Sequence, residues 1–140
     1  MQSRRELPAW LWVHARAAVH AATTAVRIMA LARRGPFDEV LERLRAGPAF
    51  RGPLADPLVH ARVVSRLLPV LPPWRMGVCM KRSLVLLHLW SRCGLAPRLH
   101  LGFRPPAGGR WDGHAWLSTG DPSIDALWPA PEGFIEAFDL

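Results

Sequence analysis

The segment from Cys79 to Arg92 constrains the fold more than any other part of the 140-residue chain. Residues 84–90 are apolar except for His88, with leucine at four positions and a tryptophan at the end. A helix that is apolar around most of its circumference is typical of a buried position. We therefore predict that residues 79–92 form the central helix of the fold, which ends at Gly94 because glycine is the preferred residue just past a helix.

Three further helices are predicted before this segment. The first occupies residues 7–34, an alanine-rich stretch that ends at a Gly-Pro pair. The second covers residues 37–45, where apolar side chains fall at positions i, i+3, i+4 and i+7. The third covers residues 57–68, because Asp56 is a good helix cap and the proline after it suits the first helical position.

Alternating patterns after the central helix predict strands. Residues 98–104 and 113–118 alternate as half-buried strands, and we predict a third short strand at residues 123–127. Helices followed by an antiparallel meander indicate the α+β class. We expect one domain over the whole chain, with a helical part at residues 1–70 and a core at residues 71–140.

The charge and the cysteines limit the possible functions. The net charge of +7 comes from basic residues that are scattered along the chain, which is typical of solvated helix faces and does not predict a nucleic-acid partner. Cys79 and Cys93 lie on one predicted helix, roughly 21 Å apart at 1.5 Å per residue. The two cysteines cannot form a disulfide with each other, so we expect a cytoplasmic protein. The sequence contains no metal-binding or cofactor-binding motif, so we expect neither a metal ion nor a cofactor.

The first predicted helix is long enough to raise the question of a membrane span. Its apolar run is broken by four polar positions, which are His14, Arg16, His20 and Arg27. These interruptions argue against a transmembrane segment and against a secretion signal. We interpret the helix as a packing element whose basic, tryptophan-bearing side is a candidate surface for a partner protein.

Cys79 is the candidate nucleophile. A loop rich in proline and glycine at residues 71–77 precedes it, so the thiol is predicted at the N-terminus of the central helix. Unpaired backbone N–H groups and the positive end of the helix dipole favour an anion there, which makes a thiolate easier to form. The N–H of Cys79 would also stabilise an oxyanion, with a second donor from Trp74, Arg75 or His100.

His114 is the candidate general base. It lies on the second predicted strand, which can bring an imidazole close to the start of the central helix. His88 is nine positions from Cys79 and therefore points to the opposite face of the helix. His100 lies on the first predicted strand and is a weaker candidate, because no acidic residue is near it in the sequence.

A catalytic imidazole needs a third group that orients it, and the chain contains no asparagine for this role. Asp125 is the preferred candidate because it falls on the strand predicted beside His114. Asp121, in the preceding turn, is its main competitor. Asp112, two residues before His114, is a weaker alternative.

Two readings without catalysis compete with this triad. Cys79 and His114 would then be an ordinary helix cysteine and a core histidine, which is the common fate of single residues of these types. A basic, tryptophan-rich module that binds nucleic acid or an acidic peptide is the other reading. It is weakened because most of the seven tryptophans fall on predicted apolar faces, where we expect them in the core.

The ordered set of motifs resembles the leader peptidases of lasso peptide biosynthesis, the B2 proteins, within the transglutaminase-like cysteine protease superfamily. The resemblance covers about the last ninety residues. It rests on Cys-Met-Lys-Arg-Ser-Leu at 79–84, Gly-Leu-Ala-Pro-Arg-Leu-His-Leu-Gly at 94–102, His-Ala-Trp-Leu at 114–117 and the final Asp125. The segment Ser-Thr-Gly-Asp-Pro at 118–122 departs from the family pattern in two ways: an acidic residue is more usual after His-Ala-Trp-Leu, and the segment is one residue shorter than the common spacing. These departures leave the choice between Asp125 and Asp121 open.

The resemblance implies a transglutaminase-like or papain-like core and a bacterial, cytoplasmic cysteine protease of the peptide-maturation type. Cys79 would be the nucleophile, His114 the base and Asp125 the orienting carboxylate in cleavage of a ribosomally made precursor at its leader–core junction. A separate leader-binding protein would recognise the leader peptide, and a macrolactam cyclase would use the product. The same thioester chemistry permits a transglutaminase-like acyltransferase, because sequence does not decide whether water or an amine resolves the intermediate.

Overall fold

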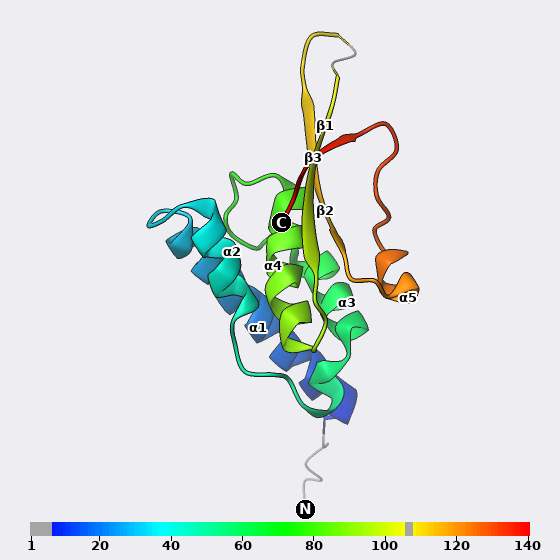
Figure 1. Ribbon diagram of the computed structural model, residues 1–140. Helices are drawn as coiled ribbons and strands as arrows, with labels where there is room; N and C mark the ends of the chain where they lie inside the picture. The colour runs from blue at the N-terminus through cyan, green and yellow to red at the C-terminus, as the bar shows by residue number, and fades with distance from the viewer. Residues whose placement is uncertain (1–6, 106–107) are drawn as a thin grey trace, which may run out of the picture.

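The computed structural model describes residues 7–105 and 108–140. Its helices pack around one central helix, and a small sheet covers the remaining side of that helix (Figure 1). In chain order the elements are α1 (Ala9–Leu31), α2 (Phe37–Arg45), the short 3-10 turn η1 (Gly52–Ala55), α3 (Pro57–Leu67), α4 (Val78–Arg92), β1 (Arg98–Arg104), β2 (Asp112–Ser118), α5 (Pro122–Asp125) and β3 (Ile135–Asp139). The predicted α+β class is confirmed.

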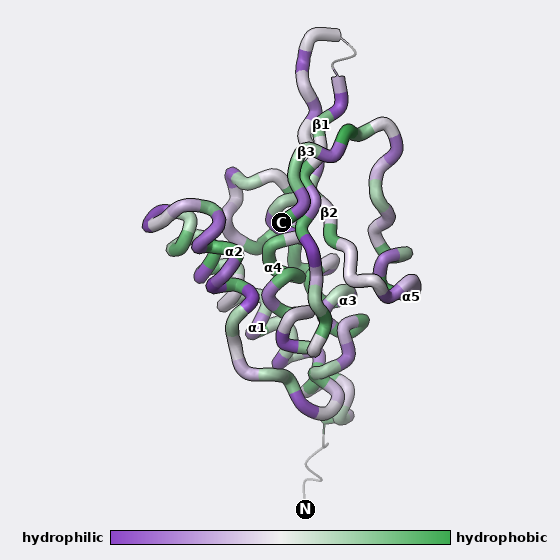
Figure 2. The backbone as a smooth tube through the Cα atoms, viewed as in Figure 1, coloured by the Kyte–Doolittle hydropathy of each residue, from purple (hydrophilic) through white to green (hydrophobic). Residues whose placement is uncertain are grey.

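Helix α4 is the centre of the core, as its composition predicts. Every residue from Ser83 to Trp90 is buried, and α4 packs against α1, α2, α3 and β2. Figure 2 shows the hydrophobic residues on α4 and the hydrophilic ones on the outer side of α2. Full burial of a leucine side chain stabilises a fold by about 1.5–3 kcal/mol, so this helix contributes a large share of the apolar stabilisation.

Three polar side chains of α4 hold it in place by donating to backbone carbonyl groups of different elements. The buried Lys81 donates from Nζ to the carbonyl of Leu71 at 2.6 Å, in the loop before the helix. The other two bonds reach α2 and α3: His88 Nδ1 lies 2.7 Å from the Leu44 carbonyl, and Trp90 Nε1 donates to the Pro57 carbonyl at 3.1 Å. Burying these groups is tolerated because each has a partner.

The sheet has the strand order β2-β1-β3, with both pairs antiparallel. Strands β1 and β2 are paired from Arg98↔Ser118 to Arg104↔Asp112, close to the bounds that alternation predicts. Their far ends project beyond the helices (Figure 1). Leu99, Ala115 and Leu117 join the hydrophobic core that includes α4, so the alternate residues point to the other face of the sheet.

The prediction of a third strand at residues 123–127 is wrong. These residues begin with the single helical turn α5, because the Asp121 carboxylate accepts from the backbone N–H of Ser123 and Pro122 occupies the first helical position. The third strand is β3, which pairs with the other edge of β1. Asp125 therefore lies at the end of a helical turn and not on a strand beside His114.

The expectation that most tryptophans are buried is also wrong. Four of the seven are more than half exposed, and they lie at the start of α1, in the loop before α4 and just before β2: Trp10, Trp12, Trp74 and Trp111. These places are outside the packed layers, so an apolar local pattern there does not imply burial. Among the described residues, no helix has both the length and the hydropathy to cross a membrane.

Candidate active site

Cys79 occupies the first turn of α4, where the sequence predicts it, and its side chain is half-buried. The capping residue, Gly77, has no side chain that could satisfy the first N–H groups of the helix. These groups are therefore available to stabilise negative charge on a nearby sulfur or oxygen atom. The thiol lies beside the hydrophobic core, which it contacts as a partly buried residue.

Cys93, at the other end of α4, has the properties of a structural cysteine. Its Sγ lies 3.7 Å from the Leu54 carbonyl, to which it donates a weak hydrogen bond. Burial, with a smaller effect from the charge of Asp56, raises the pKa of the Cys93 thiol to about 12. A thiol of this kind is protonated at neutral pH and a poor nucleophile.

His114 lies in the middle of β2, half-buried, on the face of the sheet opposite Ala115. Its ring stacks with Trp116 at a centroid distance of 6.3 Å and packs against Phe134 at 5.4 Å. Burial lowers the pKa of His114, the positive charge of Arg82 lowers it further, and the charge of Asp112 raises it. The imidazole is therefore neutral at pH 7, which is the form that a general base needs.

The three acidic candidates have different partners. The Asp125 carboxylate accepts from the backbone N–H and the hydroxyl of Thr119, at 2.7 and 2.8 Å, and from the N–H of Gly120 at 3.1 Å. Asp121 caps α5 and accepts two bonds from Ser123, which lower the pKa of its carboxyl group. Asp112 pairs with Arg104 at 2.6 Å.

Within residues 7–105 and 108–140, Cys79, His114 and Asp125 form no hydrogen bond with one another. Asp125 instead shapes the Thr119–Gly120 turn that follows β2. Of the three acidic candidates, Asp112 is the one whose charge acts on the pKa of His114. The assignment of Asp125 as the orienting carboxylate stays a prediction.

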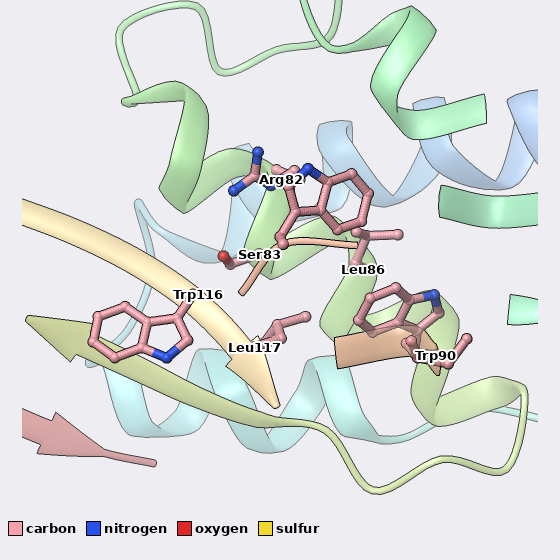
Figure 3. Close-up of a pocket in the computed structure, with 8 residues that line it drawn as sticks. Arg82, Ser83, Leu86, Trp90, Trp116 and Leu117 are labelled. Carbon is pink, nitrogen blue, oxygen red and sulfur yellow. The ribbon is translucent and has the colours of Figure 1, made fainter. Parts of the chain in front are cut away.

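A junction between α4, β2 and the segment around α5 brings the neighbours of all three candidates together (Figure 3). Arg82 and Ser83 follow Cys79 on α4, Trp116 follows His114 on β2, and Ile124 precedes Asp125 on α5. The cavity in this junction is about 10 Å³, enough for one water molecule at most. The junction is therefore a packed support for the site and not a substrate pocket.

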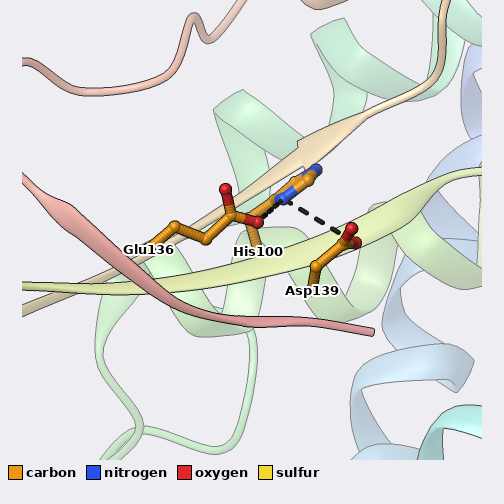
Figure 4. A group of neighbouring side chains, drawn as sticks. All are labelled: His100, Glu136 and Asp139. Carbon is orange, nitrogen blue, oxygen red and sulfur yellow. Dashed lines mark hydrogen bonds and ion pairs between the residues drawn. The ribbon is translucent and has the colours of Figure 1, made fainter.

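A second polar cluster lies on the sheet, and the sequence did not predict it. The His100 ring bridges the three strands, with Nδ1 2.5 Å from Glu136 Oε1 and Nε2 2.6 Å from Ser118 Oγ. Asp139 lies 3.9 Å from the same ring (Figure 4) and pairs with Arg98. Glu136 is 36 positions from His100 on a strand that was not predicted, so no local signal indicated this pairing.

These three ligand-type residues lie close enough to share a metal ion geometrically, with ligand atoms within 4.8 Å of one another. Their existing partners account for them without one. Both nitrogens of His100 are hydrogen-bonded, and the Asp139 carboxylate is paired with a cation. We interpret the cluster as the tie that fastens β3 to the sheet.

Comparison with protein families identifies the architecture. The family model described as "Transglutaminase-like superfamily" matches residues 21–135, most of the chain. The chain belongs to this superfamily. The comparisons with curated proteins and with solved structures found no match to this chain. The family match agrees with a helix headed by cysteine and packed on a small antiparallel sheet, and it shows the superfamily without showing a substrate.

Proposed function

We propose that this transglutaminase-like protein is a thiol peptidase that removes the leader from a lasso peptide precursor. One observation carries the proposal: Cys79 lies in the uncapped first turn of the central helix of a transglutaminase-like domain, and His114 lies on the strand packed against that helix. The more specific proposal, that the protein is a leader peptidase, also rests on the motif resemblance at residues 79–84, 94–102 and 114–117.

The proposed reaction uses these residues in two steps. His114 takes the proton of the Cys79 thiol as the sulfur attacks the scissile carbonyl carbon, and the N–H groups of the first turn of α4 stabilise the oxyanion. The imidazolium of His114 gives its proton to the leaving amine, which leaves the leader as a thioester on Cys79. Water then loses a proton to His114 and attacks the thioester, which releases the leader acid and the thiolate.

The partner proposal uses the outer side of α1. This side carries Trp12, Val19 and Val26, all more than half exposed, and α1 contains no acidic residue. A separate leader-binding protein with an acidic, apolar surface would complement it. Deletion of α1 is not a usable test, because its other side contributes buried residues such as Ala21 and Ile28 to the core.

The activity is tested with a lasso precursor, its leader-binding protein and the enzyme, with products identified by mass spectrometry. We expect one cut at the leader–core junction, lost in Cys79→Ala and reduced at least a hundredfold in His114→Gln. Asp125→Asn, Asp121→Asn and Asp112→Asn identify the orienting residue. Cleavage that survives Cys79→Ala would refute the proposal.

Two further measurements separate the alternatives. Addition of hydroxylamine traps an acyl-enzyme, and transfer to an added amine in preference to water would favour an acyltransferase. For the docking surface, Trp12→Ala with Val19→Ser is expected to weaken binding to the leader-binding protein at least tenfold. Val70→Ala, an exposed change outside α1, is the matched control.

A further inference from the structure

A groove lies between the C-terminal end of α1 and the loop before α4. Its volume is about 600 Å³, within the range of about 300–1,000 Å³ that is usual for ligand-binding sites. The apolar part of its lining includes Met29, Pro73, Trp74 and Met76. Trp74 is 71% exposed, and its indole N–H donates to the Val70 carbonyl at 3.3 Å. The groove therefore offers an open apolar surface whose largest side chain has its polar atom already engaged.

The charged side chains of this groove are both positive. Arg33, just after α1, and Arg75, in the loop, line it, and no acidic residue among the described ones does. Both arginines are exposed, and neither forms an ion pair within the described part of the chain. Glu39 of α2 lines a separate depression with Arg34 and Arg43. The groove is therefore complementary to a ligand that carries negative charge next to an apolar group.

The groove borders the segment that carries the candidate nucleophile. Met76 lines it, and Cys79 follows Met76 by three residues, so their Cα atoms are at most about 11 Å apart. Gly77 lies between them, with open space where a side chain would be. An extended peptide covers such a distance with about three residues. A peptide whose scissile bond is at Cys79 therefore reaches the groove with residues close to that bond.

The groove also continues the surface that we propose for the leader-binding protein. Met29 follows Val26 by three residues on α1, and side chains at this spacing are neighbours on one side of a helix. The exposed Val26 belongs to the proposed docking surface, and Met29 belongs to the groove. A peptide held by a protein on α1 would therefore meet the groove between that protein and Cys79.

We propose that this groove binds an acidic and apolar segment of the peptide substrate, within about four residues of the bond that is cut. The carboxylate of that segment pairs with Arg33 or Arg75, and a neighbouring aromatic or aliphatic side chain packs on Trp74 and Met76. A peptide is favoured over a folded partner because the site is a hollow that holds only a few side chains. The inference rests on the proposed function in one respect, namely that Cys79 cuts a peptide.

The binding test uses acetyl-Glu-Phe-Glu-amide and its uncharged counterpart acetyl-Gln-Phe-Gln-amide, added to the Cys79→Ala protein so that no peptide is cut. Binding is followed at low ionic strength by NMR of the Trp74 indole N–H and the methionine methyl groups. We expect the acidic peptide to bind more tightly. Arg33→Gln and Arg75→Gln should each weaken its binding about threefold, and the double variant about tenfold, as for exposed ion pairs.

Two matched variants show whether the charges are responsible. Arg33→Lys/Arg75→Lys keeps both charges and should retain most of the binding, which separates loss of charge from loss of structure. Arg62→Gln removes an exposed arginine of α3, outside the groove, and should leave binding unchanged. Equal binding of the two peptides, or unweakened binding by Arg33→Gln/Arg75→Gln, overturns the proposal.

The cleavage test places one glutamate or one glutamine at each position within about four residues of the scissile bond of a lasso precursor. At one or more positions, glutamate should lower KM about threefold relative to glutamine with kcat unchanged, because the groove contributes binding and no chemistry. Arg33→Gln/Arg75→Gln should remove this preference. If this variant instead loses affinity for the leader-binding protein and keeps the peptide preference, the groove belongs to that protein and the proposal is wrong.

The two tests also separate this inference from the proposed function. Binding of the acidic peptide in the groove without any precursor cleavage supports the groove as a peptide site and removes the leader peptidase. Cleavage without a preference at any position, together with equal binding of the two short peptides, removes the groove and keeps the peptidase.

Discussion

Acidification from pH 7.5 to 5.5 is expected to destabilise this protein through its buried histidines. His60 is fully buried and His88 almost so, and each ring is held by one backbone carbonyl: Leu54 for His60 and Leu44 for His88, both at 2.7 Å. Burial lowers the pKa of both histidines, only partly offset by these bonds. In His60 the bonded nitrogen is Nε2, so a second proton would go to the buried Nδ1, which has no partner.

The sign of the effect follows from proton uptake. Below the ordinary histidine pKa of about 6.5 the unfolded chain binds protons that the folded protein does not, so the free energy of unfolding falls as the pH falls. Each such histidine contributes a slope of up to about 1.4 kcal/mol per pH unit. Between pH 7.5 and 5.5, His60 and His88 together lower the free energy of unfolding by up to about 2.7 kcal/mol.

This loss is a large fraction of the 5–15 kcal/mol that is usual for a small domain, so it is measurable. The assay is urea unfolding followed by circular dichroism at intervals from pH 7.5 to 5.5. The double variant His60→Gln/His88→Gln keeps an amide donor for both carbonyl groups but binds no proton. We expect it to lose most of the pH dependence between these limits.

The control is His14→Gln, since His14 bonds only to the Trp10 carbonyl of its own helix. It should leave the slope unchanged. Burial also lowers the pKa of His20 and of His114, so the double variant retains a residual slope in the same direction. A wild-type slope below about 0.5 kcal/mol per pH unit, or a double variant with the wild-type slope, would refute the reasoning.

Three further predictions concern packing and the second thiol. Gly102→Ala would place a Cβ 2.9 Å from the Trp116 ring, so we expect a loss of about 1–3 kcal/mol and a lower Tm by circular dichroism. Cys93 should stay unmodified by iodoacetamide at pH 8 in the folded protein, because its pKa is about 12, and should react once urea unfolds the chain; peptide mapping reports both states. Leu87→Ala, in the fully buried part of α4, should cost about 2–5 kcal/mol in urea unfolding, while the exposed Val70→Ala should change it by less than about 0.5 kcal/mol.

The helices and the first hairpin were predictable because their signals are local. The apolar run of α4, the stripe of α2 and the alternation at residues 98–104 each require only neighbours in the sequence. The position of Cys79 followed from the same signals, since a proline- and glycine-rich loop precedes a strongly helical segment. Membership of the transglutaminase-like superfamily agrees with the motif resemblance at this coarser level.

The C-terminal part was harder because its signals compete. Asp121 and Pro122 start a helical turn, and this outweighs the weak strand pattern of the residues after them. Strand β3 is exposed along its whole length, so it has no alternation between buried and exposed residues from which to predict it. The environments of His100 and Arg82 depend on contacts between distant segments, which one sequence does not reveal.

The three donors that fasten α4 have a consequence for how far homologous sequences can diverge. Each of Lys81, His88 and Trp90 donates to a main-chain carbonyl, and every type of amino acid supplies that acceptor. Residues at the accepting positions can therefore be exchanged without removing the bond. Packing still limits the buried acceptors Leu44 and Leu71 to apolar residues, but such exchanges leave the bonds that orient the thiol-bearing end of α4 in place.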